Sequence, residues 1–191
     1  MTKIYVCLQV RTSSMRMPYK CFLPIKNLEC IKILINRIKS KKYLLNILTS
    51  DHFSDDFLQK KIKDSSYKVF RGDLENVYMR FLSFSKKLNN DDIIVRVTGD
   101  NIFVNHDLIN EVVNYFKKNN YNYVSIDRKK SKLPYGISVE VFNVKTLRKW
   151  NAISDYEKEH VTPRILNNEK KIGFFHKKNL NNFYNLSCTM D

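Results

Sequence analysis

Short apolar runs alternate along this chain with segments whose apolar residues recur at helical spacing, and this alternation is the strongest constraint on the fold. We expect strands at 4–8, 43–48, 67–70, 92–98, 121–126, 137–143, 171–175 and 183–189, the one at 137–143 being antiparallel. We expect helices at 28–38 (capped by Asn27), 54–62, 74–88, 106–118 and 156–167, the last broken or restarted at Pro163. Strands alternating with helices predict an α/β fold, with a mainly parallel sheet and helices on both faces.

The loops that follow the predicted parallel strands carry charges and hydroxyls. They are residues 11–20, 49–51, 71–73 and 99–101. A sheet of this kind binds ligands outside the carboxyl ends of its strands. We therefore expect these four loops to converge on one site.

The first of these loops is the most basic. It reads VRTSSMRMPYK from residue 10 to residue 20. Arg11 and Arg16 offer forked donors, Lys20 a compact charge, and Ser13 and Ser14 hydroxyls and main-chain N–H groups, all of which suit a triphosphate. The loop has neither the Walker pattern nor G-x-G-x-x-G. A solvated surface loop is the alternative.

Three regions of the later chain carry further candidates. Asp100 follows the clearest strand, and Gly99 before it permits a tight turn with positive φ. A carboxylate there suits Mg²⁺ beside phosphates, although a turn-capping role is equally open. Arg96 lies inside the strand and favours a structural ion pair. Glu140 either lines the cleft or is solvated, and His160 is either structural or in contact with substrate.

Composition limits the remaining options. A chain of 191 residues predicts one domain, here residues 1–191. No apolar run approaches bilayer length, and no signal peptide is visible. The four cysteines lack C-x-x-C spacing and predict neither a zinc site nor disulfides. We therefore expect a cytoplasmic protein. The net charge of +15 would suit nucleic acid, but the lysines are spread along the chain and favour solvated surface.

Several separated motifs together resemble one family. They are the loop at 10–20, against a family pattern A-R-x-x-S-[TS]-R-[LM]-P-G-K, then FRG at 70–72, IIVRVTGDN at 93–101, GISVEVF at 136–142 and EHVTPRI at 159–165. The chain resembles the cytidylyltransferases that make CMP-activated sugars, and most closely the spore coat polysaccharide biosynthesis protein F branch. The synthetases of CMP-sialic acid and CMP-Kdo are relatives. The resemblance runs across nearly the whole chain.

This resemblance implies a Rossmann-like nucleotide-diphospho-sugar transferase fold. It also implies transfer of CMP from CTP to an acceptor, such as a sugar, with release of pyrophosphate. Carried onto this chain, the resemblance implies nucleotide binding by Arg11, Ser14, Arg16 and Lys20, with Ser13 beside them, and base or ribose contacts near Arg71, Thr49 and Ser50. It implies that Arg16 and Lys20 also stabilise the departing pyrophosphate. It further implies Mg²⁺ binding by Asp100 and Asp191, and acceptor contacts by Glu140 and His160. A homodimer is a further option.

Three departures from the family pattern keep an alternative open. Tyr19 stands where the family has glycine, Val10 where it has alanine, and the sequence ends at Asp191 where relatives usually continue. A degenerate nucleotide-binding or assembly protein of the same fold would also tolerate these changes. The sequence leaves the acceptor open between an acidic sugar, another sugar, and a phosphonate or phosphate compound.

Overall fold

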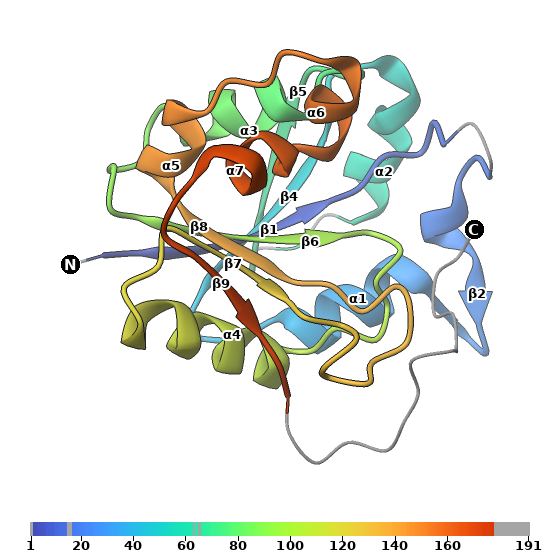
Figure 1. The fold of residues 1–191 in the computed structure, drawn as a ribbon. Coiled ribbons are helices and arrows are strands. Elements are labelled where there is room, and N and C mark those ends of the chain that lie inside the picture. The colour runs from blue at the N-terminus through green and yellow to red at the C-terminus, as the bar shows by residue number, and fades with distance from the viewer. Residues whose placement is uncertain (1, 15–16, 63, 65, 178–191) are drawn as a thin grey trace.

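The computed structural model describes residues 2–14, 17–62, 64 and 66–177 of the chain. Figure 1 shows a central twisted sheet covered by helices on both faces. The elements are β1 (Ile4–Gln9), η1 (Lys20–Phe22), β2 (Pro24–Ile25), β3 (Leu28–Glu29), α1 (Cys30–Ile38), β4 (Leu44–Ser50), η2 (Phe53–Asp55), α2 (Asp56–Lys61), β5 (Lys68–Gly72), α3 (Val77–Ser85), β6 (Ile93–Thr98), α4 (His106–Lys118), β7 (Tyr123–Ile126), β8 (Glu140–Asn143), α5 (Val144–Lys149), α6 (Asp155–His160), α7 (Pro163–Asn168) and β9 (Ile172–Phe175).

The main sheet has seven strands in the order β5-β4-β1-β6-β8-β7-β9. Strand β8 runs antiparallel to both of its neighbours, and every other pair is parallel. The chain builds outward from β1 through β4 to β5, then crosses back to place β6 on the other side of β1. This reversal between β1 and β6 is the topological switch point at which open α/β sheets bind ligands. The predicted α/β fold class and the antiparallel strand near 137–143 are confirmed.

Two apolar clusters hold the helices against the sheet. Side chains of β1 alternate between them: Val6 and Leu8 pack with α1 and α4, and Cys7 packs with α3, α5 and α7. Two helical layers with a sheet between them remove nearly all apolar side chains of the central strands from water.

The structure corrects two predicted elements. Asn27 does not cap a helix: Pro24–Ile25 and Leu28–Glu29 form a small antiparallel hairpin, and Lys26 in its turn has a φ of 55°. Helix α1 begins only at Cys30 and has no side-chain cap. Helix α5 was not predicted, although Asn143 caps it by accepting from the Thr146 N–H at 2.9 Å. The predicted strand at 183–189 lies outside the described residues.

The turn of this hairpin explains why the sequence pattern misled. Lys26 has a φ of 55°, a left-handed conformation that no helix interior contains. The apolar residue Leu28 then lies half exposed on β3 and does not join the buried face of α1. The predicted break at Pro163 is confirmed, because α6 ends at His160 and Pro163 opens α7 at a position where its missing N–H costs nothing.

Candidate active site

A cavity of about 560 Å³ opens at the carboxyl ends of β1 and β6. Its volume lies within the range of small-molecule sites, and its position is the switch point of the sheet. Residues that follow β1, β6 and β7 line it, together with residues that precede β8 and residues at the end of α6. The predicted convergence of loops is therefore confirmed for the loops after β1 and β6.

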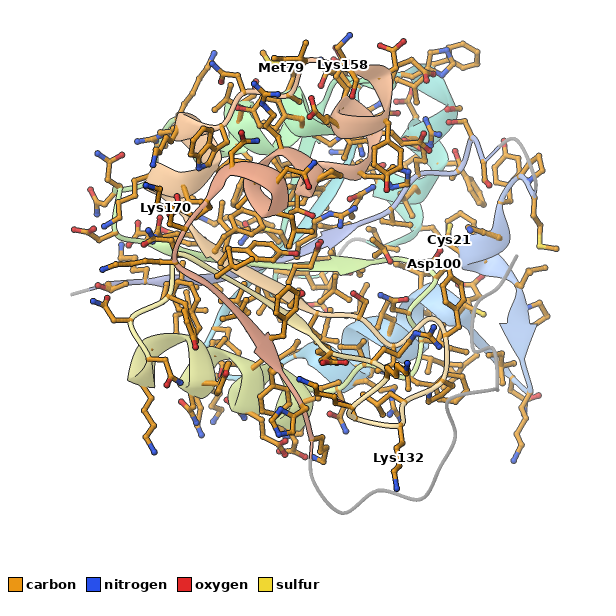
Figure 2. All side chains as sticks on the ribbon, viewed as in Figure 1. Cys21, Met79, Asp100, Lys132, Lys158 and Lys170 are labelled. Carbon is orange, nitrogen blue, oxygen red and sulfur yellow. The ribbon has the colours of Figure 1, made fainter. Side chains whose placement is uncertain are left out.

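Cations outnumber carboxylates around this cavity. The basic residues that line it are Arg11, Lys20, Arg80, Arg96 and Arg128, and the acidic ones are Asp100 and Glu159. Charges of one sign in a concave site raise the local concentration of ligands of the opposite sign. Elsewhere, lysines such as Lys132 and Lys170 point outward into solvent, as Figure 2 shows. The cavity therefore favours an anionic ligand.

Asp100 faces the cavity from the end of β6 (Figure 2). Its Oδ1 accepts a hydrogen bond from Thr98 Oγ1 at 2.6 Å, and its Oδ2 lies 3.5 Å from Lys20 Nζ. The two strongest sequence candidates, Lys20 and Asp100, are thus brought together from positions 80 residues apart.

Gly99 is needed for close packing and not for the positive φ that we expected. Among the described glycines, Gly136 has a positive φ and Gly99 does not. A Cβ on Gly99 would lie 2.9 Å from Val10 Cγ2 and 3.0 Å from Val10 Cβ. Val10, which departs from the alanine of the family pattern, therefore fills the space that Gly99 leaves.

The loop after β1 is closed at its base by Thr12 and Tyr19. The Tyr19 N–H donates to the Thr12 carbonyl at 2.8 Å, and Tyr19 has φ 58° and ψ 18°, the left-handed region in which glycine is most at ease. Tyr19 thus adopts the backbone conformation that suits the glycine of the family pattern. This substitution leaves the loop closed, and Lys20 directly after it lines the cavity.

Two arginines reach the cavity beside the N-terminal end of α3. Arg11 Nη1 donates to the Leu74 carbonyl at 3.2 Å, and the fully buried Arg80 donates through Nε to the Asp73 carbonyl at 2.9 Å. Burial lowers the pKa of Arg80 to about 10, with a smaller lowering effect from the charge of Arg11. Arg80 was not among the site residues predicted from the sequence. Its signal is a cation three residues after Val77, on the apolar face of the predicted helix.

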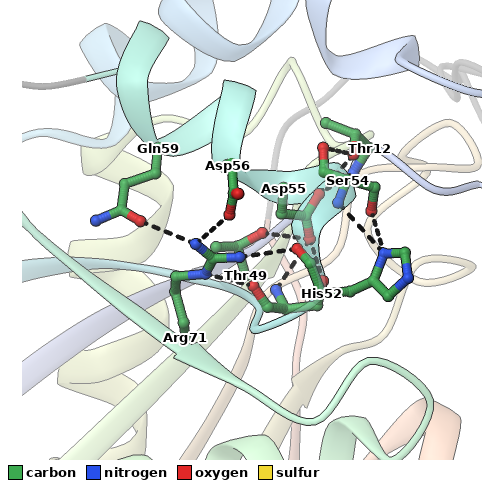
Figure 3. Close-up of polar contacts among 9 residues, drawn as sticks. Thr12, Thr49, His52, Ser54, Asp55, Asp56, Gln59 and Arg71 are labelled. Carbon is green, nitrogen blue, oxygen red and sulfur yellow. Dashed lines mark hydrogen bonds and ion pairs between the residues drawn. The ribbon is translucent and has the colours of Figure 1, made fainter.

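Thr49, Ser50 and Arg71 do not line this cavity. Thr49 and Ser50 donate to the buried Asp55, as Figure 3 shows for Thr49. Arg71 donates to the carbonyls of Ser50 and His52, each at 2.8 Å. These contacts give all three residues structural partners, so their nucleotide contacts stay a prediction. Ser13 also lies outside the lining, while Ser14 is part of it.

Glu140 forms a buried ion pair with Arg96. It also accepts from Tyr123 Oη at 2.7 Å and from Thr162 Oγ1 at 2.5 Å. The structural ion pair expected for Arg96 is confirmed, and the predicted contact of Glu140 with the acceptor stays a prediction. Glu140 neither lines the cavity nor faces solvent, because three donors hold it between strands and α7; Arg96 is the member of the pair that reaches the cavity. Burial raises the pKa of Tyr123, and the charge of Glu140 raises it further.

A strained turn brings His160 and Glu159 to the cavity. Val161 is fully buried with φ 71° and ψ −51°, and the Thr162 N–H donates to the His160 carbonyl at 2.8 Å. This is a γ-turn of the rare positive-φ kind, which costs energy for a β-branched residue. The His160 ring packs against the Tyr156 ring, with centroids 4.4 Å apart and the ring planes tilted by 53°. Its lining position agrees with the predicted acceptor side, whose role stays a prediction.

Some predicted features fall elsewhere or lie outside the description. Arg16 and Asp191 are outside the described residues. Within the described ranges there is no group of three or more His, Cys, Asp and Glu side chains that could hold a metal by themselves. Cys7, Cys21 and Cys30 are free and buried, and burial raises the pKa of Cys21 to about 12, so its thiol stays protonated. No helix among the described residues is both long and apolar enough to cross a membrane.

The fold and the position of the cavity are typical of α/β proteins that bind ligands at the switch point of the sheet. A family model described as Cytidylyltransferase matches residues 5–187, so the chain belongs to the cytidylyltransferase family and is a nucleotidyltransferase. The chain is 36% identical over 178 residues to an uncharacterized protein of Methanocaldococcus jannaschii, a match that covers 91% of this chain and 71% of that protein. It is 30% identical over 178 residues to the spore coat polysaccharide biosynthesis protein SpsF of Bacillus subtilis, covering 87% of this chain and 71% of SpsF.

Solved structures share the fold. A cytidylyltransferase from Leptospira borgpetersenii superposes with a TM-score of 0.87 at 27% identity, over 100% of this chain and 82% of that one. A CMP-2-keto-3-deoxy-manno-octonic acid synthetase complexed with CTP superposes with a TM-score of 0.67 at 14% identity, over 92% of this chain and 90% of that one. The predicted resemblance to the cytidylyltransferases is confirmed.

Proposed function

We propose that this chain transfers CMP from CTP to a small-molecule acceptor, a sugar, with release of pyrophosphate, and that it serves the synthesis of a surface polysaccharide or glycoconjugate. The observation that carries the proposal is the cation-lined cavity at the switch point of a cytidylyltransferase fold. The relatives support the rest: SpsF is named for spore coat polysaccharide biosynthesis, and the synthetase of similar fold was solved with CTP.

The chain's own cations suit the phosphates of CTP. Arg11, Ser14 and Lys20 come from the loop after β1, which closes on one side of the cavity. Transfer at an α-phosphate depends on positioning and on stabilising negative charge, and fixed cations in a partly buried cavity supply both. We assign Lys20 to the departing pyrophosphate, because a compact ammonium matches concentrated charge.

Asp100 is the residue that would hold Mg²⁺. Its carboxylate faces the cavity, and Mg²⁺ is commonly held by one or two carboxylates together with substrate phosphates, so a single carboxylate without a preformed cluster fits. When bound, the ion would neutralise charge on the α-phosphate and orient it. Lys20, 3.5 Å from Asp100, would then be drawn toward the phosphates.

His160, Glu159 and Arg96 would meet the acceptor. They reach the cavity from segments of the chain other than the loop that suits the phosphates. His160 and Glu159 each offer a group able to accept a proton from an acceptor hydroxyl. Arg96, held by Glu140, offers a fixed donor for an acceptor oxygen.

Two measurements test this proposal. Calorimetry with CTP, UTP, ATP and GTP, each with and without Mg²⁺, should show binding of CTP that requires Mg²⁺ and is lost in Asp100→Asn. Asp91→Asn is the matched control, because Asp91 is an exposed aspartate on the surface with a single lysine partner. Pyrophosphate release with a panel of acidic and neutral sugars then identifies the acceptor. CTP binding without pyrophosphate release for any acceptor would favour the non-catalytic alternative.

A further inference from the structure

Asp55 is a charged side chain with no exposed surface, placed in the turn η2 directly after β4. Both of its oxygens accept hydrogen bonds. Oδ1 accepts from the Thr12 N–H at 2.7 Å and from Thr12 Oγ1 at 2.6 Å. Oδ2 accepts from Thr49 Oγ1 at 2.8 Å, from the Ser50 N–H at 3.0 Å and from Ser50 Oγ.

This arrangement joins two parts of the site that are far apart in sequence. Thr12 lies in the loop after β1, and Thr49 and Ser50 end β4 (Figure 3 shows Thr12 and Thr49). Thr12 also accepts from the Tyr19 N–H at 2.8 Å, so one residue fixes both ends of the loop. Asp55 holds that residue by its main chain and its side chain together.

The residues next to these anchors are the ones that line the cavity. Arg11 precedes Thr12, and Lys20 follows Tyr19. A shift of the anchors would therefore move both cations relative to a bound nucleotide. Because a misplacement of about 1 Å in an active site can cost a large factor in rate, the position of Thr12 would decide how well the two cations meet the phosphates.

A carboxylate suits this role better than its amide would. Burial alone would raise the pKa of Asp55, but the hydrogen bonds from Ser50, Thr12 and Thr49 outweigh burial and lower it, so the group is ionised at neutral pH. In Asp55→Asn, one acceptor oxygen becomes an NH₂ group that faces donors. The hydrogen bonds on that side would be lost while the groups stay buried.

We propose that Asp55 is a positioning residue of the nucleotide site, which sets the geometry of the loop after β1 through Thr12 and thereby the affinity for CTP. This inference rests on the proposed function, because it takes CTP as the ligand of the cavity. Asp55 does not touch the nucleotide in this account.

The test compares CTP binding and loop protection in four variants. With Mg²⁺ present, Asp55→Asn should weaken CTP binding by at least roughly tenfold, the equivalent of one to two lost buried hydrogen bonds. Thr12→Val should weaken it by roughly fivefold, since the hydroxyl is lost and the main-chain N–H remains. Thr12→Ser, which keeps the hydroxyl, should stay within about twofold of the unmodified chain.

Glu169→Gln is the matched control for stability. Glu169 is another buried carboxylate with several donors, among them Trp150 Nε1 at 3.1 Å, but it lies outside the cavity lining. Its loss should lower the unfolding temperature and leave CTP affinity unchanged. A merely structural role for Asp55 predicts the same pattern for Asp55→Asn as for Glu169→Gln, and that result would overturn the proposal.

Amide hydrogen exchange separates failure of this inference from failure of the proposed function. Exchange at Thr12 and Tyr19 should accelerate in Asp55→Asn and in Thr12→Val, without nucleotide, and stay unchanged in Glu169→Gln. If the unmodified chain binds no CTP, the proposed function fails, and this measurement still shows whether Asp55 holds the loop. If Asp55→Asn does not fold, Thr12→Val decides: unchanged CTP affinity with unchanged exchange contradicts the proposal.

Discussion

The packing of Gly99 against Val10 predicts a large effect from a single added methyl group. In Gly99→Ala, the new Cβ would lie 2.9 Å from Val10 Cγ2, 3.0 Å from Val10 Cβ and 3.3 Å from the Gln9 carbonyl oxygen. Ordinary contacts of this kind are longer by roughly half an ångström, and Val10 is buried and stiff at χ1, so it cannot turn away. Overpacking of this sort costs about 1–3 kcal/mol.

Urea unfolding measures this cost directly. A loss of about 1–3 kcal/mol corresponds to a fall of roughly 3–10 °C in the unfolding temperature for a chain of this size. The change Val10→Ala supplies the alanine of the family pattern and opens the space. We therefore expect Gly99→Ala to be less destabilising in the Val10→Ala background, with a coupling of about 1 kcal/mol or more. Gly99→Ala with the stability of the unmodified chain, or strictly additive effects in the double variant, would refute the packing argument.

Three further predictions concern charged side chains. Glu140→Leu should lower the free energy of unfolding by about 3–5 kcal/mol, because Arg96 is left buried without its partner. Adding Arg96→Met to this variant should restore part of the lost stability. Equal stability of the single and the double variant in urea would contradict this reasoning. The pKa of Glu169 is lowered from 4.5 to about 2 by hydrogen bonds that outweigh burial, so its contribution to stability is present above pH 4.5 and lost as the pH falls toward 2. In Glu169→Gln, the free energy of unfolding should therefore depend less on pH between 4.5 and 2 than in the unmodified chain. The same pH dependence in both chains would contradict this role of Glu169. Lys20→Met should strengthen Mg²⁺ binding in the absence of nucleotide by roughly fivefold, because the ammonium beside Asp100 is gone. The same variant should weaken CTP binding. Calorimetry that shows both affinities changed in the same direction would refute this prediction.

The sequence predicted best what depends on local pattern. The bounds of α4, His106–Lys118, are those expected, because a long amphipathic stretch has one way to bury its apolar face. Pro163 marked the boundary between two helices for a reason that is equally local. The hairpin before α1 could not be foreseen, because its turn places Lys26 in the left-handed backbone region, which residues other than glycine adopt only rarely.

The candidate site was predictable in part for the same reason. Arg11, Lys20 and Asp100 follow strands that were recognised, and the topology of a parallel sheet brings the ends of such strands together. Arg80 was missed although its signal is local, a cation on the apolar face of the predicted helix. Asp55 was missed because its role arises from contacts between segments distant in sequence. Asp55 lies 43 residues from Thr12, and only the folded chain shows that the two meet.

The left-handed conformation of Tyr19 bears on the alternative of a degenerate protein. A residue other than glycine was grounds for expecting a different loop shape. The structure instead keeps a left-handed residue at this point, with the Thr12–Tyr19 hydrogen bond closing the loop. The departure from the family pattern thus changes an exposed side chain and keeps the hydrogen bond that closes the base of the loop.

Calorimetric titration of the unmodified chain with CTP and Mg²⁺ tests the central claim most directly. The cation-lined cavity predicts that CTP binds in the presence of Mg²⁺, and that this binding is lost when Mg²⁺ is omitted and in Asp100→Asn. Absence of CTP binding by the folded chain, or equal binding with and without Mg²⁺, would contradict the assignment of this cavity as a cytidylyltransferase site.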